Sequence, residues 1–72
     1  MIDIKKLESM PSELEFEALL MILEEVGGNI EHIRKLNDEY WASIYDEEFA
    51  MYKQLSRDIR VRLKILYQAK GQ

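Results

Sequence analysis

Apolar residues recur along this chain at the spacing of helices. The strongest pattern lies in residues 46–69, where six apolar side chains follow one another at intervals of three or four positions. They are Phe49, Tyr52, Leu55, Ile59, Leu63 and Leu66. That period places them on one face of a helix, which predicts a long C-terminal helix over residues 46–69.

The same C-terminal helix carries a smaller apolar strip on its far side. It consists of Met51, Val61, Ile65 and Ala69. In a small helical fold the neighbouring helices cover one face of this helix, so two opposed apolar strips predict a second partner. This pattern is the main indication of self-association in the sequence.

Two more helices are predicted ahead of it, over residues 12–26 and 30–43. Ser12 and Glu15 have the spacing of a capping box at the first helix, and Asn29 is a favourable N-cap for the second. Gly27 is expected to end the first helix, because glycine adopts the left-handed conformation at low cost, and Gly28 completes a corner.

The helix predicted over residues 12–26 is apolar over most of its circumference, which is typical of a helix with neighbours on more than one side. Three acids, Glu13, Glu17 and Glu24, gather on one narrow side of it. We call these three residues the acidic strip and expect it to be solvated.

A break is predicted between the second and third helices, although residues 41–46 contain neither glycine nor proline. Projected at ~100° per residue, the apolar stripe turns by roughly 75° across this junction. Asp46 is a suitable cap, and Glu47 and Glu48 then lie in a first turn, where the helix dipole favours acids. The alternative is one helix over residues 30–69, roughly 60 Å long, as in an intertwined dimer.

Together these elements predict an all-α domain of three helices over residues 1–72, with a glycine corner between the first two helices and a long C-terminal helix. Residues 1–11 are expected to form a lead-in, either extended or a short helix. The chain has 72 residues and no cysteine, so its own core is small and disulfides cannot reinforce it. Association as a helical dimer is therefore expected.

Composition argues against several functions. The chain has one histidine and no cysteine, which disfavours a metal site, and none of its serines lies in a nucleophile motif. We therefore expect no enzymatic activity, no metal and no cofactor. The longest apolar run, residues 18–23, is far shorter than the ~20 residues of a membrane span, and no signal peptide is visible. A cytoplasmic protein without membrane contact is expected.

The corner resembles that of Fis-type DNA-binding modules through Ala18, Leu19, Gly27, Gly28 and Asn29. The resemblance implies a helix-turn-helix, but it ends at the corner. Where that family has a second glycine turn and a basic recognition helix, residues 37–48 hold five acids and no base. DNA phosphates would repel these acids, so we interpret the corner as architecture and assign the chain to no family.

Charge is distributed unevenly along the chain. Residues 1–52 hold four bases and thirteen acids, net −9, whereas residues 53–72 hold six bases and one acid, net +5. Lys53, Arg57, Arg60 and Lys64 are spaced to form one ridge on the C-terminal helix, which we call the basic ridge. The ridge could pair with acids of the same or a partner chain, bind nucleic acid, or lie on an anionic membrane or in an acidic groove. The net charge of −4 favours the first.

These observations predict a small non-catalytic interaction or assembly module, which its compactness suggests is bacterial or from a phage. The partners expected are a second copy of the chain, with a dimer favoured, or another protein. The predicted contact residues are Trp41, Tyr45, Met51, Val61 and Ile65. The alternative is a nucleic-acid-associated regulator that uses Lys53, Arg57, Arg60 and Lys64.

Overall fold

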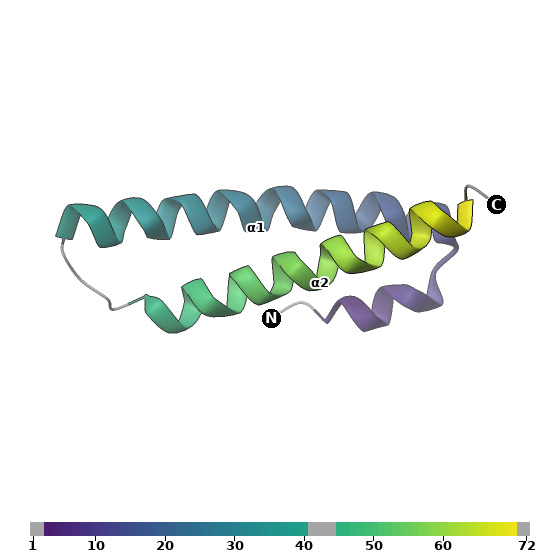
Figure 1. Cartoon of the computed structure of the whole chain (residues 1–72), viewed down its shortest axis with the longest axis horizontal. Coiled ribbons are helices and arrows are strands. Elements are labelled where there is room, and N and C mark those ends of the chain that lie inside the picture. The colour runs from purple at the N-terminus through teal and green to yellow at the C-terminus, as the bar shows by residue number, and fades with distance from the viewer. Residues whose placement is uncertain (1–2, 41–44, 71–72) are drawn as a thin grey trace.

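The computed structural model describes residues 3–40 and 45–70, and these residues form three helical elements joined by short connections. They are the 3-10 helix η1 (Ile4–Ser9) and the α-helices α1 (Ser12–Tyr40) and α2 (Asp46–Lys70). In Figure 1, α1 and α2 run antiparallel as a hairpin. The all-α class is thereby confirmed, because the described ranges contain no strand.

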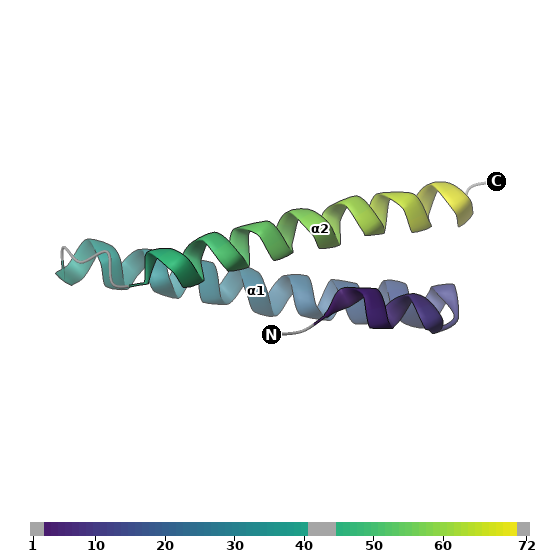
Figure 2. The same cartoon turned by 90° about the horizontal axis from the view of Figure 1, so that it is seen from below.

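The element η1 lies at the open end of the hairpin, where α1 begins and α2 ends. Figure 2 shows it beside α1, with the C-terminal half of α2 passing above both. Ile4 and Leu7 pack against the core from this position. The lead-in predicted over residues 1–11 is thus a short helix, one of the two forms expected, with Asp3 accepting a hydrogen bond from the Lys5 backbone N–H at 3.1 Å.

The core runs along the line where α1 and α2 meet. Its buried members are Leu19, Val26, Leu55, Ile59 and Leu66. Three of these belong to the periodic stripe of the C-terminal helix, and the observed α2 begins where that helix was predicted to begin and ends one residue beyond its predicted end. Hydrophobic periodicity was a reliable guide here because α2 has a single covered face.

The predicted glycine corner is wrong. The helix α1 continues without interruption for 29 residues and contains both Gly27 and Gly28. Glycine lowers helix stability by roughly 1 kcal/mol relative to alanine, but this local preference is weak compared with tertiary packing. Val26 and Ile33, on either side of the glycines, are both buried. The free energy gained by burying both side chains on one helix exceeds the local cost of the two glycines.

Alanine at either glycine is expected to stabilise the protein by about 0.5–1 kcal/mol. A methyl group built at Gly27 or Gly28 meets no atom within 4 Å, so the helix accommodates it without a clash. Urea unfolding of Gly27→Ala and Gly28→Ala at one protein concentration checks this result. A loss of stability in either variant would instead indicate the left-handed corner, where alanine is strained.

The break between the second and third predicted helices is confirmed, because α1 ends at Tyr40 and α2 begins at Asp46 and returns alongside it. One continuous helix over residues 30–69 is thereby excluded. Asp46, Glu47 and Glu48 occupy the first turn of α2, as the sequence predicts. Residues 41–44, which include the predicted contact residue Trp41, lie outside the described part of the chain.

Candidate interaction surfaces

One buried ion pair holds the three elements together at the open end of the hairpin. The Arg62 guanidinium donates two hydrogen bonds to Glu15, at 2.7 Å from Nε and 3.0 Å from Nη2. The Glu15 residue is 1% exposed, and Glu8 of η1 approaches Arg62 to 3.9 Å. Arg62 of α2 therefore joins α1 and η1, and it fixes where η1 lies against α2.

The hydrogen bond to Glu15 raises the pKa of Arg62 above its ordinary value. Partial burial opposes this effect, and the charges of Glu15 and Glu8 reinforce it. A group with a raised pKa contributes its full stabilisation below its ordinary pKa and loses it as the pH rises through the raised value. For arginine both values lie far above neutral pH, so the guanidinium stays charged in ordinary buffers and high pH within that range does not break the pair.

The Glu15 carboxylate thus has a different role from the one its spacing predicts. Ser12 is the first residue of α1, and the backbone N–H of Glu15 donates to the carbonyl of Pro11 at 3.0 Å. Because both carboxylate oxygens accept hydrogen bonds from Arg62, the predicted capping box is wrong. The spacing Ser12-x-x-Glu15 carries no information about a partner 47 residues away.

Three members of the apolar strip of α2 lie beside η1: Met51, Val61 and Ile65 are 46%, 61% and 49% exposed. They line a shallow groove whose other wall is Asp3 together with Ile4, Lys5 and Glu8 of η1. The fourth predicted member, Ala69, lines a different groove with Glu13 and Glu17. Tyr45, at the entry to α2, is 38% exposed. Four of the five predicted contact residues therefore have accessible side chains, and the fifth is Trp41, outside the described residues.

The basic ridge follows the opposite flank of α2. Lys53, Arg57, Arg60 and Lys64 are all exposed. Among the described residues, the ion pairs within 4 Å involve Arg62 alone, so the ridge makes no such pair with its own chain. Lys53 Nζ lies 5.3 Å from the centre of the Phe49 ring, a weak cation–π contact. The ridge is available to a partner.

The acidic strip of α1 lies on the same side of the hairpin as the basic ridge. Glu13 and Glu17 line a groove with Tyr67 of α2. Ile22 of α1 lines a different groove with Met51, and Met51 also lines the groove beside η1, so Ile22 lies on the η1 side of the hairpin. On a helical projection at ~100° per residue, Glu24 falls with Glu13 and Glu17, roughly 150° from the buried stripe of Leu19 and Val26, so the acidic strip forms the outer edge of α1 on this side. All three acids are exposed. One side of the hairpin therefore carries acids along α1 and bases along α2.

Several exposed apolar residues were missed by the sequence analysis, which assigned most of them to a covered helix. They are Leu14, Leu20, Met21 and Tyr67, between 45% and 72% exposed. A helix that is apolar nearly all round was expected to have neighbours on several sides. In the described part of the chain, α1 packs against α2 and η1 alone, so part of its apolar surface remains accessible.

The described residues provide no group of three histidines, cysteines or acids arranged to hold a metal ion. None of the helices in residues 3–40 and 45–70 has the length and hydropathy needed to cross a bilayer. His32 is exposed on α1.

Comparisons with known proteins provide no family for this chain. It matches no protein-family model, no curated protein and no solved structure.

Proposed function

We propose that the protein is a small non-catalytic assembly module that associates with a second copy of itself through the apolar strip of α2. The observation that carries the proposal is the exposure of Met51, Val61 and Ile65 along one groove beside η1. Removing a side chain of this size from water contributes about 1.5–3 kcal/mol. The core of the described residues has five clustered buried apolar residues, and a domain of this size is marginal on its own, so covering this strip adds substantially to its stability.

The groove also offers polar groups at its rim. Gln54 Nε2 donates a hydrogen bond to Asp58 at 2.9 Å, and both residues line the groove between the apolar side chains. Interfaces typically have an apolar centre with polar groups at the edge. Asp3, Lys5 and Glu8 on the other wall of the groove form such an edge, whereas the Gln54–Asp58 pair lies between Met51 and Val61 and makes its hydrogen bond within the chain.

Ile65→Asp is expected to weaken assembly at least tenfold, because a carboxylate within the strip loses its hydration on contact. Sedimentation equilibrium over a range of concentrations measures the dissociation constant. Ala50→Asp is the matched control, since it adds the same group to an exposed position of α2 outside the groove. An unchanged constant for Ile65→Asp would rule out the strip as the contact.

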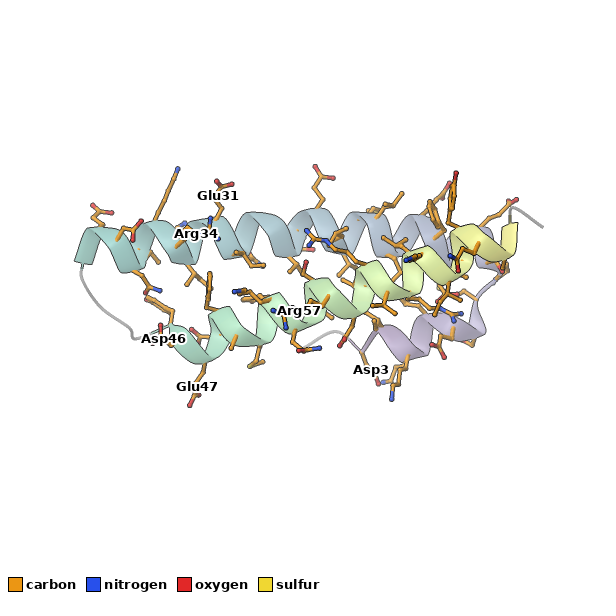
Figure 3. All side chains as sticks on the ribbon, in the orientation of Figure 1. Asp3, Glu31, Arg34, Asp46, Glu47 and Arg57 are labelled. Atoms are coloured by element: carbon orange, nitrogen blue, oxygen red, sulfur yellow. The ribbon has the colours of Figure 1, made fainter. Side chains whose placement is uncertain are left out.

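Binding of nucleic acid through the basic ridge is the second candidate, favoured by the exposure of all four bases. The surroundings of the ridge oppose it. The acidic strip lies on the neighbouring helix α1, and further acids project from the outer sides of the hairpin, Glu31 from α1 and Glu47 from α2 (Figure 3). These carboxylates repel a phosphate backbone that approaches the hairpin. A gel shift of duplex DNA at low salt, lost in Arg57→Glu/Arg60→Glu, would support this candidate against ours.

A further inference from the structure

The side of the hairpin opposite η1 has an arrangement of charge that is complementary to itself. The acidic strip follows the outer edge of α1 and the basic ridge follows α2, so the two rows of charge border this face at its two margins. Between them lie apolar groups: Leu20 is 45% exposed, Tyr67 is 72% exposed and Phe16 is half-buried. An apolar centre between two rows of opposite charge is suited to a protein partner that has the reverse order of charge.

We infer that this face binds the same face of a second copy, with a two-fold axis parallel to the helices, so that α1 of each chain lies against α2 of the other. This proposal deepens the proposed function and rests on it for the choice of a second copy as the partner. It adds a second contact, because the apolar strip of Met51, Val61 and Ile65 lies on the other flank of α2, beside η1.

Charge complementarity favours this axis over a two-fold axis in another direction. A two-fold axis in the plane of contact but perpendicular to the helices would place α1 on α1 and α2 on α2. Glutamates would then face glutamates and the basic ridge would face itself, which is unfavourable in both rows. The parallel axis brings acids onto bases in both halves of the interface, and each helix then has antiparallel neighbours, as in many four-helix bundles.

The parallel axis also fixes the register. Rotation about it leaves every residue at the same height along the bundle, so the register between chains is the register within the hairpin. Glu15 and Arg62 define that register through their hydrogen bonds. Pairs with the same sum of residue numbers lie at the same height. They are Glu13 with Lys64, Glu17 with Arg60, and Glu24 with Lys53.

Each member of the acidic strip therefore lies level with one base of the ridge, and Leu20 lies level with Arg57. Such exposed pairs contribute at most about 1 kcal/mol each, but their number and symmetry set orientation. Leu20 and Tyr67 supply the apolar area of the contact, and the charged pairs set its orientation. The fit between three acids on one helix and three bases at the same heights on the other is the observation that carries this inference.

A mixing experiment with two charge-reversed variants tests it. The first variant is Glu17→Lys/Glu24→Lys, and the second is Lys53→Glu/Arg60→Glu. Both are made in the Ile65→Asp chain, so that the strip beside η1 does not contribute. Each variant alone places like charges on both sides of the two-fold contact, and we expect its self-association to weaken at least tenfold relative to the Ile65→Asp parent.

Mixing the two variants in equal amounts is expected to restore association to about the parental dissociation constant. Lysines of the first variant then face glutamates of the second, and the unaltered rows of both chains also face each other. Loss of folding in either variant cannot produce such a recovery. Ile65→Asp takes the formal charge from −4 to −5, so the first variant carries −5 + 4 = −1 and the second −5 − 4 = −9. Both chains are then negative, and general attraction between them does not explain the recovery either.

A cis variant carrying all four reversals is the internal control, and it should associate with itself as the parent does. No recovery on mixing, with both variants folded by circular dichroism, would overturn the inference. Tighter duplex DNA binding by the Glu17→Lys/Glu24→Lys variant without recovery on mixing would also overturn it, in favour of a nucleic-acid ligand. A wrong assignment of the apolar strip as a contact gives a different result: the dissociation constant of the Ile65→Asp chain is then the same as that of the natural chain.

Discussion

Replacement of Arg62 by methionine is expected to lower the free energy of unfolding by about 3 kcal/mol. Among the residues that the structure describes, Arg62 is the only hydrogen-bond partner of the Glu15 carboxylate, whose residue is 1% exposed. The substitution removes this partner, and it also frees Glu8 of η1 from its charged neighbour. An uncompensated buried charge typically costs about 3–5 kcal/mol. We expect the lower end, because Arg62 is itself partly exposed and its loss admits water to Glu15. Urea unfolding followed by circular dichroism measures the change.

The double variant Glu15→Met/Arg62→Met separates the ion pair from its environment. Replacing a buried pair by apolar side chains of similar size is often neutral or stabilising, so most of the lost stability should return. If Arg62→Met alone unfolds no more easily than the natural chain, the Glu15 carboxylate is solvated and the ion pair does not hold η1, α1 and α2 together.

Truncation of Leu19 to alanine is expected to cost about 3 kcal/mol, within the 2–5 kcal/mol range of buried leucines. Leu19 is 0% exposed and packs in the cluster that contains Ile59, which is also 0% exposed. Leu14→Ala is the matched control on the same helix, because Leu14 is 50% exposed and lies in neither proposed contact. That change should cost less than about 1 kcal/mol. Equal losses for the two variants would contradict the arrangement of α1 against α2.

The sequence was sufficient to predict α2 because its apolar period is uninterrupted. From Leu55 to Leu66 the apolar residues recur at helical spacing, and the acids at Asp46 and Glu47 mark the start of the helix. The reversal of the chain ahead of Asp46 was also predictable, since the apolar stripe changes direction there. These signals are local, and the packing observed in the structure agrees with them.

The glycine corner could not be judged correctly from local signals. Two adjacent glycines followed by asparagine are typical of a helix end, yet α1 continues through them. The deciding contribution comes from Val26 and Ile33, which are buried only when both lie on one helix face against α2. Helix propensity differs by roughly 1 kcal/mol per glycine, a difference that a few buried side chains exceed.

The role of Glu15 was equally hidden, for a different reason. Its spacing from Ser12 fits a capping box, whereas its actual partner is Arg62 on another helix. No pattern within residues 12–26 identifies that partner, because the pairing depends on how the hairpin aligns. By contrast, the accessibility of Met51, Val61 and Ile65 followed from their place on the far side of the α2 stripe. We propose that a second copy of the chain covers them.

Sedimentation equilibrium of the natural chain at micromolar concentration tests the central claim most directly. That claim is that a hairpin of this size leaves apolar and charged surfaces that a second copy covers. It requires a concentration-dependent mass that reaches at least twice the 8.6 kDa of one chain. A single species of 8.6 kDa, fully helical and unchanged across the concentration range, would contradict the account.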